Sequence, residues 1–381
     1  MSIKVYKVGG CIRDKLLGIK SDDIDYVVVG GTYKDMLDRG YRSVGRDFPV
    51  FLHPKTRAQY ALARVEKKSG VGYHGFQFDT NADITLEQDL KRRDITINAI
   101  AEDESGNLID PFNGISDLHN KLIRHVSEAF SEDPLRVLRV ARFRAKFGFK
   151  IAPKTLNLMR KIVDGNELKH IAKERIWGEI GKALATTHPL LFFTTLDKVG
   201  ALAQILPELA LAITDKDTYA KIKRKLSQHN LSALNESMRF AIICGCLCSS
   251  GHGIIADKLN NKALLGRDCT ELSKLVIKFS QAILNLHNLT AVKMLDLVER
   301  LDLRRKPERF RALNQVLQLI FNYSDKKVYI RNMQKVITIH NQFSRINYAD
   351  IRQKSTNLEF LNEIRAIKLD IIRKELYHAH S

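Results

Sequence analysis

The sequence has no apolar stretch that approaches the roughly 18–20 residues a membrane-spanning helix needs. Its most apolar stretch, 240–247, has only the length of a core helix. The first residues, MSIKVYKVGG, lack the basic start and long apolar core of a signal peptide and predict a short strand that runs into a glycine turn. We therefore expect a soluble, cytoplasmic protein without a membrane partner. Its oligomeric state stays open, with a monomer favoured.

Cysteine is scarce as well. The chain has five cysteines, and an odd number among 381 residues does not suggest a disulfide framework. Three of them, Cys244, Cys246 and Cys248, alternate along one segment. Residues two apart on a helix point about 200° away from each other, so these thiols cannot all converge on one metal ion. We expect them to be buried apolar side chains.

Acidic residues are too few to balance the basic ones. The 62 Lys and Arg residues against 43 Asp and Glu give a formal net charge of +19 and a pI near 9.6. A surplus of this size indicates a polyanionic partner, either nucleic acid or an acidic membrane surface. A basic protein with no such partner is the alternative. The length allows two to four domains with sizeable cores.

Two regimes are visible along the chain. Up to about residue 110, short β-rich runs such as IDYVVVGG alternate with glycine and aspartate turns. After about residue 123, apolar residues recur at three- and four-residue spacing, as in DPLRVLRVARFRAKF. The pattern predicts an α/β head followed by an all-α remainder, with breaks near Pro111, Pro153 and Pro207.

The first motif that carries chemistry is GGCIRD, followed after a short predicted helix by SDDIDYVVV. The glycine pair lets a phosphate approach the backbone, the helix N-terminus favours an anion, and Arg13 adds a forked cationic contact. Asp23 and Asp25 lie two apart on the next predicted strand and so share one face. Two carboxylates beside a phosphate site suit magnesium. A solvated, aspartate-rich turn is the alternative for the second segment.

The second motif is LKRRDITINAIA, in which Arg92 and Arg93 precede Asp94. A capping aspartate before an apolar stretch is typical of a helix entry, and the motif could be no more than that. The arginine pair could also hold a triphosphate or stack on a base. Taken alone, the motif does not decide between the two.

The third motif is SEDPLRVLRVARF. Four charged residues recur in it at every third position: Asp133, Arg136, Arg139 and Arg142. On a helix, each step of three residues shifts the side-chain direction by only about 60° around the axis, so these residues form one polar stripe. The apolar residues of the same helix would anchor it in a core. A solvated, salt-bridging stripe is the alternative to a functional one.

An Asp–Arg pair on such a stripe can distinguish bases. Aspartate accepts a hydrogen bond from an exocyclic amine while arginine donates one to the adjacent ring nitrogen. Cytosine and adenine both present an amine beside a ring-nitrogen acceptor. Guanine and uracil instead present an oxygen acceptor beside an N–H donor. Such a pair can therefore accept C and A and reject G and U without a nucleic-acid template.

Together, GGCIRD, DDIDYVVVG, LKRRDITINAIA and EDPLRVLRVARF resemble the class II tRNA nucleotidyltransferases, the bacterial CCA-adding enzymes. The resemblance runs from about residue 3 to residue 205, and the later helices match only loosely. It implies a head at 1–122 with the nucleotidyltransferase fold shared with DNA polymerase beta. A helical neck at 123–205 would recognise the base, and a helical body and tail at 206–381 would bind tRNA.

The resemblance also assigns roles to single residues. Asp23 and Asp25 would be the catalytic residues and the ligands of Mg²⁺. The bound CTP or ATP would be contacted by Gly10, Arg13, Arg93, Arg139 and Arg142. The base would be read by Asp133 and Arg136, with Glu132 holding them in place. Related polymerases often use a third carboxylate, for which Glu66 and Asp94 are the candidates.

The implied reaction adds C, C and A to the 3′ end of tRNA from CTP and ATP and releases pyrophosphate. In-line attack of the primer's 3′-hydroxyl on the α-phosphate, assisted by two Mg²⁺ ions, needs positioning and charge stabilisation rather than a protein nucleophile.

Two further segments bear on the subfamily. Residues 64–78 resemble the flexible loop of full CCA-adding enzymes, which CC-adding enzymes typically lack; an ordinary basic hairpin tip is the alternative. The stretch RFAIICGCLCSS is similar to the HD phosphohydrolase segment of longer bacterial enzymes, but Gly245 and Cys246 stand where histidine and aspartate would. Because glycine has no side chain to bind a metal, we expect no functional HD domain.

Other readings remain open from the sequence alone. A poly(A) polymerase, or an enzyme that adds only CC or only A, would use the same chemistry. A catalytically silent RNA-binding protein would have no need of both aspartates and the Asp–Arg pair. A small-molecule nucleotidyltransferase shares the glycine and aspartate signature but has no use for the EDPLRVLRVARF helix or for so basic a chain.

Overall fold

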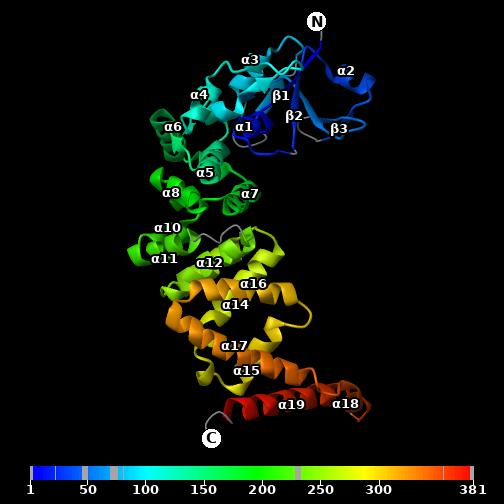
Figure 1. Ribbon diagram of the computed structural model, residues 1–381, viewed down its shortest axis with the longest axis vertical. Coiled ribbons are helices and arrows are strands. Elements are labelled where there is room, and N and C mark those ends of the chain that lie inside the picture. Colours follow the sequence, from blue (N-terminus) through cyan, green and yellow to red (C-terminus); the bar gives the residue numbers. More distant parts are fainter. Residues whose placement is uncertain are drawn as a thin grey trace. The chain divides into compact units, whose positions relative to one another are not determined.

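The computed structural model describes residues 3–21, 23–44, 50–68, 76–79, 81–227, 233–354 and 356–377. By their internal contacts the residues divide into two compact units, Met1–Pro207 and Glu208–Ser381 (Figure 1). Strands occur in the first unit, and the described part of the second is helical. The prediction of an α/β head followed by an all-α remainder is confirmed. The finer boundary near residue 122 stays a prediction.

The described residues of the first unit include a seven-stranded mixed sheet in the order β3-β4-β5-β2-β1-β8-β9. Its strands are β1 (Lys4–Val8), β2 (Asp25–Val29), β3 (Arg42–Val44), β4 (Val50–Leu52), β5 (Gln59–Leu62), β8 (Ala101–Glu102) and β9 (Leu108–Ile109). β2 and β5 run parallel, and the other neighbours are antiparallel. Val27 and Val28 belong to different apolar clusters because successive side chains of a strand point to opposite faces.

Short helices connect and cover these strands (Figure 1). They are α1 (Gly10–Leu16), α2 (Tyr33–Asp38), α3 (Leu86–Lys91), the 3-10 helix η2 (Thr96–Asn98) and α4 (Gly114–His119). α2 and α3 each begin with a capping box, in which Thr32 or Thr85 exchanges hydrogen bonds with the residue three positions on. These caps satisfy backbone N–H groups that a helix start leaves without partners and so fix where each helix begins.

A separate antiparallel hairpin is formed by β6 (Val65–Lys68) and β7 (Phe76–Asp79), in which residue 66 pairs with residue 78. The segment that joins them, 69–75, lies outside the described residues. The loop predicted at 64–78 is therefore described only in its two strands.

The remainder of the first unit is mainly helical. Its elements are β10 (Leu122–Ile123), the 3-10 helix η3 (Glu128–Glu132), α5 (Leu135–Phe147), β11 (Lys150–Ile151), α6 (Pro153–Asp164), η4 (Glu167–His170), α7 (Lys173–Leu184), α8 (Leu190–Lys198) and α9 (Ala201–Ile205). α5 packs against α7 and α8 through fully buried residues such as Val137, Leu138 and Ala141. It ends before Gly148, whose N–H donates a hydrogen bond to the backbone oxygen of Arg144. Gly148 has a φ of 71°, and this left-handed conformation stops the helix.

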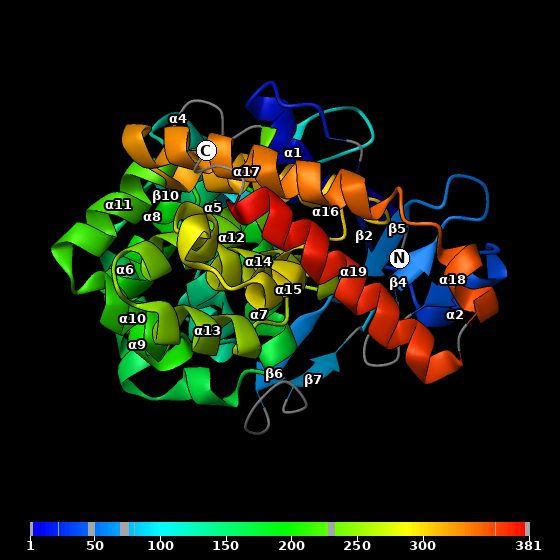
Figure 2. The same cartoon turned by 90° about the horizontal axis from the view of Figure 1, so that it is seen from below.

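The described part of the second unit is built from α-helices and one 3-10 turn. They are α10 (Pro207–Ile213), α11 (Lys216–Leu226), α12 (Glu236–Ser249), α13 (Gly253–Lys262), α14 (Arg267–Leu284), η6 (Leu286–Asn288), α15 (Ala291–Leu301), α16 (Pro307–Ile320), α17 (Tyr323–Phe343), α18 (Tyr348–Lys354) and α19 (Asn357–Tyr377). The buried helix α12 packs against α11, α13, α14 and α16. α19 lies along α15 and α17 (Figure 2).

Gly245 sets how closely α12 approaches its neighbours. A Cβ added there would overlap Cδ1 of Ile320 on α16 and would lie 2.9 Å from Cγ1 of Val276 on α14. Only glycine leaves room for both contacts, so this position of the helix core has no space for a histidine or any other side chain.

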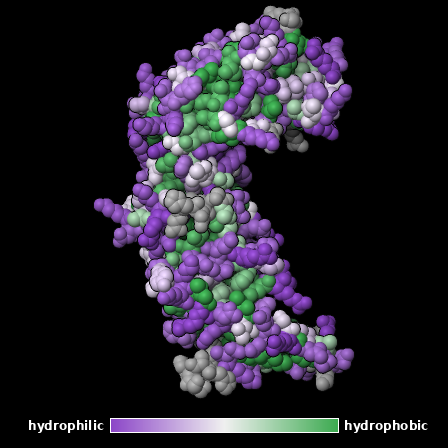
Figure 3. Space-filling view, viewed as in Figure 1, coloured by the Kyte–Doolittle hydropathy of each residue, from purple (hydrophilic) through white to green (hydrophobic). Residues whose placement is uncertain are grey.

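The surplus of positive charge is larger in the second unit. Residues 208–381 carry 29 Lys and Arg against 17 Asp and Glu. Hydrophilic side chains cover most of this unit on the face shown in Figure 3. Across the described residues, no helix has both the length and the apolarity that crossing a membrane requires.

Candidate active site

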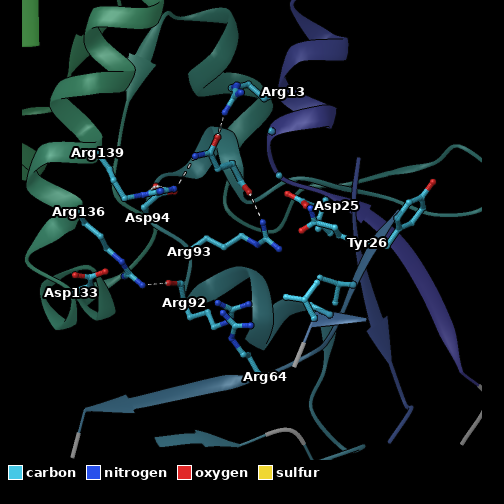
Figure 4. Close-up of a pocket in the computed structure, with 18 of the residues that line it drawn as sticks. Arg13, Asp25, Tyr26, Arg64, Arg92, Arg93, Asp94, Asp133, Arg136 and Arg139 are labelled. Atoms are coloured by element: carbon cyan, nitrogen blue, oxygen red, sulfur yellow. Dashed lines mark hydrogen bonds and ion pairs between the residues drawn. The ribbon is translucent and has the colours of Figure 1, made fainter. Parts of the chain in front are cut away.

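The first unit contains a cavity of about 530 Å³ (Figure 4). The turn between β1 and α1, the strands β2 and β5, the segment after α3 and the first turns of α5 contribute to its wall. Its charged lining consists of Arg13, Arg64, Arg92, Arg93, Arg136, Arg139 and Arg175 against Asp25, Asp94 and Asp133. Such an excess of guanidinium groups favours a ligand with several negative charges, such as a triphosphate.

The glycine turn lies at one side of this cavity. Gly9 has a φ of 77°, in the left-handed region that favours glycine, and a Cβ there would lie 2.8 Å from Nη1 of Arg93. α1 begins at Gly10 and carries Arg13 at the end of its first turn. Gly10 and Arg13 both line the cavity, as predicted, and the Arg13 guanidinium lies 4.9 Å from the centre of the Phe147 ring.

The two predicted metal ligands lie beside this turn, but not on one strand. β2 begins at Asp25, which pairs with Val8 at the end of β1. The chain turns away at Gly9, so Asp23 has no strand to pair with and precedes β2. The prediction that both aspartates belong to the strand is therefore wrong. Asp25 lines the cavity, and Asp23 is not among the described residues that do.

The carboxyl groups of Asp23 and Asp25 are close enough to repel each other. Burial raises the pKa of Asp25, and the negative charge of Asp23 raises it further, while Arg93 opposes the change. A divalent cation held by both would relieve this repulsion, and carboxylate oxygens are the ligands that hard cations prefer. The two residues thus fit a metal ion.

Asp89 fixes the arginines of the second motif. It is fully buried on α3, and its Oδ1 accepts hydrogen bonds from Nε and Nη2 of Arg92 at 3.0 and 2.6 Å. Its Oδ2 accepts one from Nη2 of Arg93 at 3.2 Å. Burial alone would raise the pKa of Asp89, but the charges of Arg92 and Arg93 hold it below its usual value. Both guanidinium groups are therefore held at the cavity wall (Figure 4).

A chain of polar contacts ties α1, η2 and α5 together (Figure 4). Nη1 of Arg13 donates to Oδ1 of Asn98, and Nδ2 of Asn98 donates to Oδ1 of Asp94 at 3.0 Å. Oδ2 of Asp94 accepts from Nε of Arg139 at 2.8 Å. Burial opposes ionisation of Asp94, yet the Arg139 charge and the Asn98 hydrogen bond keep its pKa well below the usual range. Arg13 and Arg139 are thus positioned before any ligand binds.

The predicted base-reading residues lie at the other side of the cavity. Oδ2 of Asp133 accepts from Nη2 of Arg175 at 2.9 Å. Arg136 is 7% exposed and donates to the backbone oxygens of Ala129 and Arg92, at 2.8 and 2.6 Å. The structure therefore brings Asp133 and Arg136 into one cavity and holds each through a different partner.

Two other predicted site residues are not among the described residues that line the cavity. Nε of Arg142 donates to Oε2 of the buried Glu179 on α7, at 2.6 Å. Arg142 stays beside Arg139 on α5, since both guanidinium groups lie over the Phe143 ring, at 4.4 and 5.6 Å from its centre. Glu132 ends η3 directly before Asp133. Nucleotide contact by Arg142 and support by Glu132 stay predictions.

Neither candidate for a third carboxylate is established. Asp94 lines the cavity, but its two oxygens already accept hydrogen bonds from Ile95 N–H, Asn98 and Arg139. The side chain of Glu66 lies outside the described residues.

Sequence reasoning missed several residues that organise this cavity. Asp89 precedes Arg92 and Arg93 by three and four positions, a helical spacing that could have revealed the ion pairs. Arg175 follows Asp133 by 42 positions, and no local pattern links the two. The stacked rings of Tyr26 and Tyr60, 4.4 Å apart, also line the cavity and were not predicted.

The segment compared with an HD motif is a packed helix core. Cys244 and Cys246 are buried and Cys248 is partly buried, as predicted, and burial raises the pKa of Cys246 to about 11. Within the described residues, no group of three or more His, Cys, Asp or Glu side chains is arranged to hold a metal ion.

Comparisons with known proteins agree with this geometry. Residues 5–124 match the model of the poly A polymerase head domain, and residues 148–213 match that of a probable RNA- and SrmB-binding site of polymerase A. The chain is 45% identical over 338 residues to the multifunctional CCA protein of Tolumonas auensis, covering 82% of each sequence.

Solved structures show the same fold. The CCA-adding enzyme of Bacillus stearothermophilus in complex with CTP has a TM-score of 0.68 and 24% identity, covering 98% of this chain and 90% of that one. The Thermotoga maritima enzyme complexed with tRNA has a TM-score of 0.60 and 20% identity, over 98% and 87% of the two chains. The fold and the cavity are those of a nucleotidyltransferase with a polymerase-beta-like head. The chain belongs to the class II CCA-adding enzymes. Members of this nucleotidyltransferase family depend on a divalent metal ion.

Proposed function

We propose that this enzyme adds C, C and A in turn to the 3′ end of tRNA from CTP and ATP, with Mg²⁺ bound by Asp23 and Asp25, and releases pyrophosphate. One observation carries the proposal: an aspartate pair stands beside a cavity that seven arginines line. This is the charge pattern that a metal-bound nucleoside triphosphate requires.

Asp23 and Asp25 supply hard oxygen ligands from a turn and a strand start. Bound Mg²⁺ would lower the pKa of the primer's 3′-hydroxyl and neutralise charge on the leaving pyrophosphate. The phosphates would be held by Arg13 and Arg93, whose side chains are fixed by Asn98 and Asp89. Donors that are fixed in advance stabilise developing charge without reorganising during the reaction.

Asp133 and Arg136 would select the base. In the structure Oδ2 of Asp133 accepts from Arg175 and Oδ1 accepts from the backbone N–H of Leu135, and each oxygen has a second lone pair left for an exocyclic amine. Arg136 would donate to the ring nitrogen beside that amine. Because Arg175 holds the carboxylate and two carbonyls hold the guanidinium, the pair keeps a defined orientation without a template.

The change from C to A addition would involve the segment between β6 and β7, as the resemblance of residues 64–78 to the loop of full CCA-adding enzymes implies. In this proposal the head at 1–122 would carry out catalysis, the neck at 123–205 would recognise the base, and the body with tail at 206–381 would bind tRNA. The strong positive charge of residues 208–381 supports tRNA binding there, as does the solved tRNA complex of the Thermotoga maritima relative. We place this action on tRNA in the cytoplasm, with the enzyme acting as a monomer.

Replacing the acid pair tests the proposal directly. Asp23→Ala and Asp25→Ala should each lower the rate of incorporation of both C and A by about a hundredfold or more, because the charge that binds the metal is lost. Binding of tRNA, measured by filter retention, should stay close to wild type. Asp38→Ala, at an exposed aspartate of the same unit, is the matched control and should keep full activity. Wild-type incorporation by either active-site variant would refute the metal assignment.

A further inference from the structure

The second unit has a cavity of its own, with a volume of about 670 Å³. It lies between α11, the C-terminal ends of α12 and α14, and the junction of α16 with α17. Its floor is apolar: Ile320 and Phe321 are 2% and 6% exposed. The amide side chains of Gln281, Asn285 and Asn322 contribute to its wall. None of these residues belongs to the cavity of the first unit.

Cations converge on this cavity from two helices. Lys221 and Arg224 lie one turn apart on α11, and Arg331 lies on α17. Nζ of Lys221 donates to the backbone oxygen of Ser249 at 3.3 Å. In the described part of the second unit, neither Arg224 nor Arg331 forms an ion pair.

Acidic groups do not balance these cations. Asp325 is the acidic residue among the described lining, so the three cations leave a positive surplus around the cavity. Unlike the surface arginines that pair with carboxylates elsewhere in this unit, these guanidinium groups are available to a ligand.

The buried side chain of Lys225 lies near the same positive charges. Lys225 is 6% exposed behind the cavity, and its Nζ donates to the backbone oxygen of Phe321 at 3.4 Å. Burial lowers its pKa, and the charges of Arg224 and Lys221 lower it further. The charges of Arg224 and Lys221, which disfavour a further cation at Lys225, favour an anion in the adjoining cavity.

We propose that this cavity binds a phosphate group borne by a nucleotide. Guanidinium groups on facing helices match the geometry of a phosphate, and a volume of several hundred Å³ holds a molecule of mononucleotide size. The amides and the apolar floor would contact the base and sugar. Of the described lining, His287 and Asp325 are the residues of a type that binds metals, and two are fewer than a protein metal centre uses, so we assign the cavity to binding rather than to hydrolysis. The nucleotide is either free or part of an RNA chain, since both present the same phosphate.

The test measures binding of radiolabelled inorganic phosphate and of AMP to the full-length chain by equilibrium dialysis. Arg93→Gln is introduced first, to weaken the site of the first unit. One site per chain should remain in this background. Adding Arg224→Gln and Arg331→Gln should lower its affinity at least about tenfold, because charge-assisted contacts are lost.

A control with the same change of charge separates a built site from bulk electrostatics. Arg365→Gln with Arg373→Gln, at exposed positions of α19, should leave the affinity unchanged. The proposal is overturned if no site remains in the Arg93→Gln background, or if the control pair weakens binding as much as the cavity pair. An unchanged midpoint of thermal unfolding in both double variants shows that the fold is intact.

A competing tRNA that lacks its CCA end identifies the source of the phosphate. Displacement of labelled phosphate from the second unit shows that the site takes a backbone phosphate of RNA. Simultaneous binding shows that it takes a free nucleotide. Either result supports the site, and both are independent of incorporation activity.

Discussion

Asp94 is the residue on which the contacts of the active-site cavity converge. It is buried and accepts hydrogen bonds from Asn98, the partner of Arg13, and from Arg139, and so links α1 to α5. Asp94→Asn should lower the free energy of unfolding by about 1–3 kcal/mol, because the partly exposed Arg139 guanidinium loses its charged hydrogen-bond partner. Urea unfolding measures this loss. The exposed Asp38→Asn should change little, and an unaltered midpoint for Asp94→Asn would contradict the role.

The same residue makes stability depend on pH in a defined direction. Its pKa is lowered in the folded state, so ionised Asp94 contributes stability above the ordinary aspartate pKa of about 3.9, and this contribution is lost as pH falls toward the folded-state value. Below about pH 4, wild type should lose up to about 1.4 kcal/mol per pH unit more than Asp94→Asn. Equal slopes for the two proteins between pH 5 and pH 3 would show that Asp94 titrates normally.

We propose that selection of the base depends on Arg136. Arg136→Ala would remove the proposed donor to the ring nitrogen and leave Asp133 held by Arg175. Incorporation of G and U relative to C and A should rise by about tenfold or more, the discrimination that a site built to hydrogen-bond its substrate supplies. Single-nucleotide incorporation with each of the four triphosphates measures it. Unchanged selectivity would remove the base-reading role from this residue.

At the scale of single elements, the packing around α12 leaves no room for a side chain at position 245. Gly245→Ala should destabilise the protein by about 1–3 kcal/mol, because the new Cβ would collide with Ile320 and Val276. Gly253→Ala, at the start of α13 where nothing lies within 4 Å, is the matched control and should be neutral. Denaturant midpoints compare the two. Equal stability of both variants would mean that α12 is not packed as described.

Elements with a strong local signal were predictable from the sequence. The glycine turn, β2 and α5 all follow from motifs that specify their own geometry, and all appear close to the expected positions. The exact start of β2 was not predictable, because pairing ends where Gly9 turns the neighbouring strand away. The ion pair of Arg142 with Glu179 on α7 was not predictable either, because no local pattern links the two residues.

At the scale of the whole molecule, the motifs predicted many of the residues that meet in the first cavity but not what holds them. Ion pairs such as Asp133–Arg175 and Asp94–Arg139 join segments far apart in the sequence, and only the fold brings them together. No local sequence pattern links Lys221 and Arg224 with Arg331, and these residues meet only because α11 and α17 line one cavity.

The central claim, stepwise addition of CCA, is tested most directly on a tRNA that ends at its discriminator base. Labelled CTP, ATP, GTP and UTP are supplied singly, and then CTP with ATP, in the presence of Mg²⁺. A CCA-adding enzyme should make two additions from CTP alone and add one further A when ATP is present, and then stop, with no incorporation of G or U. Unlimited addition of A to any RNA, or no incorporation at all, would contradict it.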